Sequence, residues 1–172
     1  MNRYFRYLRY LVRHKYFVFI AGLTTKTPIW RLLIHDWTKL TPQEFKPYVN
    51  FFYPSLKMME TDTTASRKSA FRSAFLHHIH NNLHHFNYWV AVSDDGKTRA
   101  QEMPEIYIRE MVADWFGAGK GISGKWDADQ WYLAHKTMLL APKTRRRVEE
   151  LLASTAAILK EKPGRVLNGR LA

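Results

Sequence analysis

The feature that most constrains the fold of this chain is its frequent helix start and stop signals, which occur with almost no strand alternation. Proline follows a capping residue at Thr27-Pro28 and Thr41-Pro42, and it opens further segments at Pro104 and Pro142. Proline suits the first helical position because the amide hydrogen that it lacks would have no partner there. The stretches between these signals carry apolar residues at helical spacing. We therefore predict an all-α, single-domain helical bundle with about six to eight helices.

The predicted elements follow from the same signals. Helices are expected over residues 3–23, 28–35, 42–54, 66–80, 86–90, 104–115, 127–140 and 142–160, with loops at 57–64, 93–98 and 117–124. Thr41 and Glu44 have the spacing of a capping box, in which the threonine caps the helix and the glutamate bonds back to the cap amide. One domain is expected over residues 1–162, and residues 163–172 are expected to form a flexible tail.

Charge and cysteine content limit the chemistry. The chain has no cysteine, which excludes disulfides, thiolate nucleophiles, iron–sulfur clusters and cysteine zinc sites. Any metal would need nitrogen and oxygen ligands, and eight histidines are present. The net charge of +12 favours anionic partners such as phosphate esters, nucleic acid or an acidic membrane surface.

The basic, aromatic N-terminal segment predicts an amphipathic first helix. Four arginines share one face at helical spacing, and apolar residues occupy much of the opposite face: Tyr4, Leu8, Leu11 and Val12. The arginine stripe is either a solvated face or a surface for membrane or nucleic acid. The uncharged stretch over residues 16–25 is too short to span a bilayer, so we expect no transmembrane segment. With no export signal, a cytoplasmic location is expected.

Histidines and aspartates form the most informative pattern. Five of the eight histidines lie within residues 77–85, which alone is also consistent with a core cluster, a surface cluster or simple hydrogen bonding. His35-Asp36 ends a very apolar helix, and Asp114 comes late in another, where a carboxylate needs a partner. Helices of a bundle can project such ligands toward one point. The candidate ligands are His14, His35, Asp36, His77, His78, His84, His85 and Asp114.

The order His14, His35-Asp36 and Asp114 resembles the HD-domain superfamily of metal-dependent phosphohydrolases. The histidine run resembles the further ligands of its two-metal members, although those histidines lie closer together here. The resemblance implies one or two divalent transition-metal ions, such as Mn, Fe, Zn, Co or Ni. HDWTK, residues 35–39, is similar to a His-Asp-x-x-Lys variant, which implies that Lys39 lies near the substrate phosphate.

A second resemblance covers most of the chain. The blocks WRLLIHDWTKLTPQEFKPY, AFLHHIHNNLHHFNYWV and MPEIYIREMVADW are similar to a family of uncharacterised proteins from bacteria and their phages, a domain of unknown function. This resemblance implies no established activity.

The leading functional prediction is a metal-dependent hydrolase of a phosphate ester, such as a nucleotide or a related small molecule. Lys39, with Arg31, Arg72 or Lys120, would hold the phosphate. Glu110, one turn before Asp114, would orient a ligand or a water, or else form a surface salt bridge. An HD-type di-iron oxygenase is one alternative.

The other alternative is a nucleic-acid-binding or host-interaction module with a structural metal site. The basic cluster at Lys143 and residues 145–147 could contact phosphates, or it could be a solvated helix face. Residues 119–126, GKGISGKW, fail as a P-loop because Trp126 replaces the required Ser or Thr. Abundant aromatic residues leave room for a homodimer interface.

Overall fold

The structure is a computed structural model that describes residues 2–161. Within this range there are eight α-helices, two short 3₁₀ helices and one β-hairpin, which confirms the all-α prediction. The α-helices are α1 (Arg3–Thr24), α2 (Ile29–Ile34), α3 (Pro42–Phe52), α4 (Leu56–Thr61), α5 (Thr64–Asn81), α6 (Glu105–Ser123), α7 (Ala128–Ala134) and α8 (Pro142–Glu161). The remaining elements are η1 (Trp37–Leu40), η2 (Phe86–Trp89), β1 (Val90–Val92) and β2 (Thr98–Ala100). The predicted tail, residues 163–172, lies outside the described residues.

Helix α1 buries a face that shares only Leu11 with the one predicted. Its buried residues follow one stripe at helical spacing: Tyr7, Leu11, His14, Val18 and Ala21. Tyr4, Leu8 and Val12, which were expected on the inner face, are exposed. The prediction is wrong because apolar and aromatic residues occur around most of this helix, so the pattern alone does not identify the packed side. The observed face places His14 inside the protein.

The predicted loop over residues 117–124 is also wrong, because α6 continues to Ser123. Gly117 lies where α6 crosses α1, and a Cβ added there would lie 2.5 Å from the backbone nitrogen of Val18. Glycine thus allows close helix contact here. Gly124, with φ of 78°, ends the helix in the left-handed conformation that favours glycine.

Three further local predictions are corrected. The predicted loop over 57–64 contains α4, whose start is capped by the side chain of Ser55. The predicted helix over 86–90 is η2 followed by a hairpin, in which Val90 pairs antiparallel with Ala100. Valines at strand spacing and a turn at Gly96, with φ of 75°, favour the hairpin there. Helix α7 stops at Ala134, well before the predicted residue 140.

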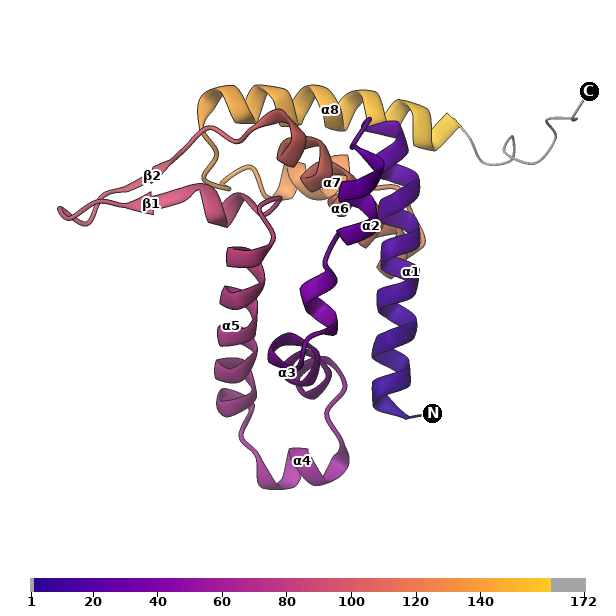
Figure 1. The fold of residues 1–172 in the computed structure, drawn as a ribbon, viewed down its shortest axis with the longest axis vertical. Coiled ribbons are helices and arrows are strands. Elements are labelled where there is room, and N and C mark those ends of the chain that lie inside the picture. Colours follow the sequence, from indigo (N-terminus) through magenta and orange to yellow (C-terminus); the bar gives the residue numbers. More distant parts are fainter. Residues whose placement is uncertain (1, 162–172) are drawn as a thin grey trace, which may run out of the picture.

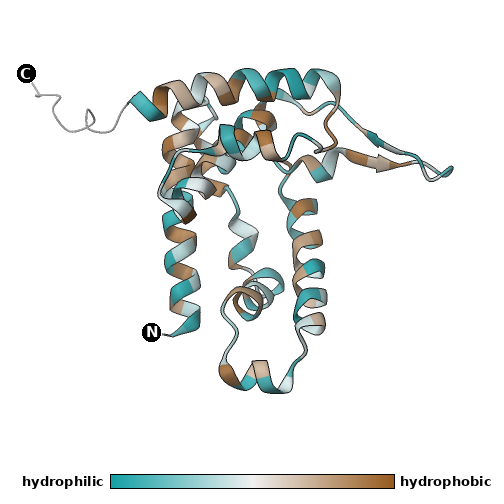
Figure 2. Ribbon diagram, turned by 180° about the vertical axis from the view of Figure 1, so that it is seen from behind, coloured by the Kyte–Doolittle hydropathy of each residue, from teal (hydrophilic) through white to brown (hydrophobic). Residues whose placement is uncertain are grey.

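Two apolar clusters hold these elements together. In Figure 1, α8 crosses one end of the molecule, α1 and α5 extend from that end, and α3 lies between them. The larger cluster joins α1, α2, α6, α7 and α8, and the smaller cluster joins α1, α3 and α5. Brown and teal alternate along α1 and α8 in Figure 2, as expected for amphipathic helices. None of the helices in residues 2–161 has the length and apolar character to cross a membrane.

Candidate metal centre

Histidine and aspartate side chains from four parts of the chain meet between the two apolar clusters. His14 lies on the buried face of α1 between Leu11 of the smaller cluster and Val18 of the larger one. Among the described residues, three groups of potential ligand atoms form there, each with all its atoms within 4.8 Å of one another, and two of them contain Asp36. Of these two, the first is His14, His35, Asp36 and Asp114, and the second is Asp36, His78, His84 and His85; the remaining group is His35, His84 and Glu110. These buried groups could hold a metal ion.

Asp36 belongs to both groups. Its Oδ2 atom lies 3.1 Å from His14 Nε2 and 3.4 Å from His35 Nε2. Its Oδ1 atom lies 3.2 Å from His78 Nε2 and 3.5 Å from His84 Nε2. One oxygen therefore faces each group. Asp36 has φ of 56°, a left-handed conformation that aspartate adopts more readily than most residues, in the sharp link between α2 and η1.

Unpaired buried atoms test whether this donor set fits a metal. Several side-chain atoms with almost no solvent contact have no hydrogen-bond partner within the described protein: His35 Nε2, Asp36 Oδ1, His78 Nε2, His84 Nε2 and His85 Nε2. Buried polar atoms without partners are rare because desolvation is costly. Each of these atoms belongs to one of the two ligand groups. Imidazole nitrogen with carboxylate oxygen is also a donor set typical of Mn, Fe, Zn and similar ions, so these residues fit such an ion.

Glu110 lies behind the histidines rather than on the surface. Its Oε1 atom is 3.1 Å from His35 Nδ1 and 3.3 Å from His84 Nδ1. Arg31 approaches its other oxygen with two nitrogens, Nη2 at 2.6 Å and Nε at 2.7 Å. With 1% of the residue exposed, Glu110 is not in a surface salt bridge. Its position fits a group that orients two ligand histidines.

Glu44 is a site residue that the sequence analysis assigned to a different role. Instead of bonding back to the start of α3, its carboxylate accepts hydrogen bonds from His77 Nδ1 at 2.8 Å and His78 Nδ1 at 2.7 Å. Thr41 makes no side-chain cap, so the predicted capping box is wrong. The sequence did contain one indication that Glu44 is buried. Glu44 lies four residues before the apolar Tyr48, and residues at this spacing share one side of a helix.

His77 is the one candidate ligand that the structure does not bring into these groups. Its side chain is 39% exposed and contacts Glu44. The other seven candidates are within the two groups. Lys39 lies beside them, with its Nζ atom donating to Asp36 Oδ2.

Buried charges in the centre stabilise one another. Burial alone would lower the pKa of His35, but the carboxylates of Asp36, Asp114 and Glu110 outweigh it and raise the pKa to about 10. Burial would raise the pKa of Glu110, yet His35 and His84 bring it down to about 2. Burial lowers the pKa of His14 and of His85. These charge pairs keep the carboxylates anionic, and a metal ion at His35 would take the place of the proton that the pairs favour.

A cavity of about 510 Å³ opens onto the centre. Lys39, His78 and His85 lie in its lining, and most of the remaining lining is aromatic. Two other cations that were expected to hold phosphate are occupied elsewhere. Arg31 is paired with Glu110, and Lys120 donates to the carbonyl of Gly124. Arg72 is exposed on α5.

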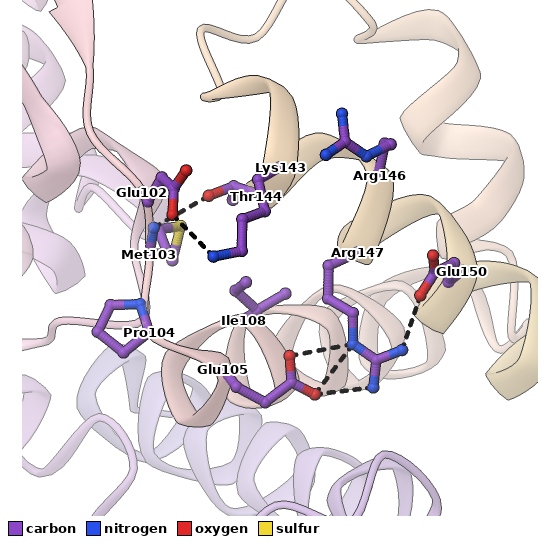
Figure 3. A pocket seen from close by; sticks show the side chains of 10 residues that line it. All are labelled: Glu102, Met103, Pro104, Glu105, Ile108, Lys143, Thr144, Arg146, Arg147 and Glu150. Carbon is purple, nitrogen blue, oxygen red and sulfur yellow. Dashed lines mark hydrogen bonds and ion pairs between the residues drawn. The ribbon is translucent and has the colours of Figure 1, made fainter.

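A separate cavity of about 500 Å³ lies between the starts of α6 and α8 (Figure 3). Five of its six charged groups in the described chain are paired within the protein: Arg147 with Glu105 and Glu150, and Lys143 with Glu102. These pairs occupy much of the basic cluster that the nucleic-acid alternative invoked. No histidine is present among its described lining residues. We therefore place the candidate site at the histidine centre.

Comparison with known proteins identifies the family. The sequence matches the family of unknown function DUF5662 over residues 3–154. The chain belongs to the DUF5662 family. The match includes every residue of the two ligand groups, together with Glu44 and Glu110. No curated protein matches the chain, and no solved structure matches it.

Proposed function

We propose that this DUF5662 protein is a metal-dependent hydrolase of phosphate esters. The observation that carries the proposal is the pair of buried ligand groups that share Asp36. Their order along the chain, with His14 first, His35-Asp36 next, then the histidine run and Asp114, is the order that resembles the HD-domain phosphohydrolases. The net charge of +12 is consistent with an anionic substrate.

The first group would hold one divalent ion, and the second would hold another, with Asp36 common to both. A divalent ion in such a site supplies Lewis acidity for a phosphoryl oxygen and makes water more acidic. In the reaction, water adds to phosphorus and the ester P–O bond breaks, which releases an alcohol and inorganic phosphate. The protein's own contribution is to fix the donors before substrate arrives, since positioned charge is most of what phosphoryl transfer needs.

Three residues outside the ligand groups have roles in this proposal. Lys39 would hold a phosphate oxygen, since its ammonium lies at the edge of the centre and lines the adjoining cavity. Glu110 would fix the ring of His35 through the hydrogen bond at its Nδ1 atom, and its carboxylate lies near His84 Nδ1. Glu44 would fix His78 in the same way. Each carboxylate leaves the Nε2 atom of its histidine facing Asp36.

The test combines metal analysis with a phosphate-release assay on the full chain. We expect wild-type protein to contain, or to take up tightly, one or two divalent ions per chain, and to release phosphate from part of a phosphate-ester panel. Asp36→Ala should lose both properties, because it removes the ligand shared by the two groups. His80→Ala is the matched control, since His80 is an exposed histidine on α5 outside both groups. Far-UV circular dichroism checks that each variant is folded.

The alternatives give different results in the same preparation. A wild-type protein that binds no added Mn, Fe, Zn, Co or Ni contradicts the proposal. Bound iron that consumes oxygen after reduction, without phosphate release, supports an oxygenase instead. DNA or RNA affinity that falls steeply with salt and is unchanged in Asp36→Ala supports a nucleic-acid-binding module.

A further inference from the structure

The cavity beside the metal centre has a wall built almost entirely from aromatic rings. Four tyrosines and three phenylalanines line it, together with Lys39, His78, His85 and Ile122. The rings come from α1, the end of α3 and α5, so residues distant in sequence form one surface. In Figure 1 these elements are the indigo helix, the short central helix and the magenta helix. A molecule in this cavity would contact the wall and two candidate metal ligands together.

The rings hold one another in place. Tyr48 meets Phe71 edge to face, with ring centroids 5.0 Å apart, and Phe71 stacks with Phe75 at 6.2 Å. Tyr7 lies 6.2 Å from Tyr48 and 6.4 Å from Tyr53. Such offset and edge-to-face contacts between aromatic rings are favourable, and they limit rearrangement of the wall. Pre-formed aromatic surfaces favour a further aromatic ring, which can meet the wall edge to face or offset-stacked, over a saturated ring or an open chain.

One polar atom in the wall lacks a partner. The residue Tyr7 is 1% exposed, yet its hydroxyl has no hydrogen-bond partner within the described protein. A buried hydroxyl normally finds a partner, since leaving it unpaired is costly. Tyr7 lines the cavity, but its hydroxyl oxygen has almost no accessible surface, so the contribution of Tyr7 to the wall is its ring.

The positive charge of Lys39 indicates which polar group a molecule bound in the cavity would carry. Among the described residues Lys39 is the one lysine or arginine in the lining, and it lies at the same end as His78 and His85. A single ammonium beside the ligand groups suits one phosphate group better than a chain of several.

We infer that this cavity is the substrate subsite of the enzyme and that it selects phosphate monoesters whose organic part is an aromatic ring. The inference rests on the proposed function, because it assigns the phosphate to the metal centre. The ring would lie against the tyrosine and phenylalanine wall, and the phosphate would face Lys39. Sugar phosphates and open-chain alkyl phosphates would be poorer substrates, since they offer the wall no aromatic ring.

A matched pair of probes tests ring recognition without changing the reacting bond. Benzyl phosphate and cyclohexylmethyl phosphate are both esters of primary alcohols, and they differ in whether the six-membered ring is flat. Titration calorimetry of the metal-loaded full chain should give tighter binding of benzyl phosphate, by about two- to tenfold. Phosphate release should show the same preference in kcat/KM.

Variants then assign the preference to the cavity. Tyr53→Leu removes one ring of the wall and should bring the benzyl to cyclohexylmethyl ratio close to one. Tyr16→Leu is the control, because Tyr16 is an exposed tyrosine on α1 that does not line the cavity, and it should keep the wild-type ratio. If Tyr53→Leu fails to fold, Phe52→Leu serves instead, since Phe52 lines the cavity and is 53% exposed.

The outcomes separate this inference from the proposed function. Equal binding of the two probes by wild-type protein overturns the aromatic subsite, even if both esters release phosphate. A preference that is unchanged in Tyr53→Leu and Phe52→Leu also overturns it. Selective binding of benzyl phosphate that is lost in these variants supports the subsite, even if no ester is hydrolysed, a result that would count against the proposed function alone.

Discussion

Glu44 and Glu110 are buried carboxylates that contact different histidines of the candidate centre. Glu44 bonds to His78 Nδ1, and Glu110 lies close to the Nδ1 atoms of His35 and His84. A histidine whose Nδ1 hydrogen is held by a carboxylate presents its Nε2 lone pair in a fixed direction. The two glutamates therefore orient His78 and His35 through hydrogen bonds at Nδ1, without belonging to the groups that contain Asp36.

The Glu44→Gln variant tests this role at the scale of one residue. The amide keeps the shape of the side chain but removes its negative charge, so His78 should be held less firmly and should be a weaker base. We expect metal affinity to fall by about 10- to 100-fold, as is typical when such a supporting partner is lost. Competition with a chelator of known affinity measures this change.

The control for Glu44→Gln is Glu60→Gln. Glu60 is exposed on α4 and has no ion-pair partner among residues 2–161. Its substitution should leave metal affinity at the wild-type value. Equal affinities for the Glu44 variant and wild type would show that the carboxylate only fills space beside His78.

Candidate ligands could be predicted from the sequence where a charged residue stands among apolar ones. His35-Asp36 and Asp114 were identified because a charged group at an apolar helix end or face needs a partner, and the structure brings both into one group. Glu44 was misassigned because its spacing from Thr41 also fits a capping box, a local rule that long-range contact with His78 overrides. His77 is partly exposed whereas the adjacent His78 is buried, and the residue type alone does not show which of two adjacent histidines points inward.

At the scale of elements, the contact between α1 and α6 positions the first ligand group. It brings His14 Nε2 to 3.3 Å from Asp114 Oδ1. Gly117, one turn after Asp114, allows this approach because its missing Cβ would otherwise meet the backbone of Val18. A backbone neighbour cannot move aside as a flexible side chain can, so the helices would have to separate.

Gly117→Ala should therefore destabilise the fold by about 1–3 kcal/mol, the usual range for overpacking. Gly121→Ala is a demanding control on the same helix, since its Cβ would meet His14 Cα at an ordinary 3.9 Å. That change should be neutral or stabilising by up to about 1 kcal/mol, through alanine's higher helix propensity. Urea denaturation measures both free energies of unfolding, and similar losses in the two variants would contradict the packing argument.

Element prediction succeeded for long helices and failed for short or glycine-rich segments. The ends of α1, α5 and α8 lie within two residues of the predicted ones because periodic apolar residues and capping signals agree there. The glycines of α6 predicted a loop, but packing against α1 offsets their low helix propensity. The hairpin was missed because its strands are three residues each, and one pair of alternating valines is too little to distinguish a strand from a short helix.

For the whole molecule, the centre lies between the two apolar clusters and touches elements from both. An ion bound there should stabilise the folded state alone, because the ligands converge only after folding. At about 100 times the dissociation constant, binding adds about 2.7 kcal/mol, which corresponds to a rise in Tm of roughly 5–11 °C for a chain of this size.

Differential scanning fluorimetry with and without the bound metal measures this shift. Removal of metal by a chelator should lower the Tm of wild-type protein, and restoring the metal should recover it. Asp36→Ala should show no metal-dependent change, whereas His80→Ala should respond like wild type. A wild-type Tm that is the same with and without metal would mean that binding is not linked to folding.

The position of the first ligand group has a consequence for the unfolded chain. His14 and Asp114 lie far apart in the sequence, and half of the buried residues of the two apolar clusters lie between them. An ion joining them would act as a reversible cross-link that closes a long loop, and closing a long loop removes much of the entropy of a disordered chain. A protein without cysteine would in this way have the equivalent of a disulfide, set by metal supply rather than by oxidation.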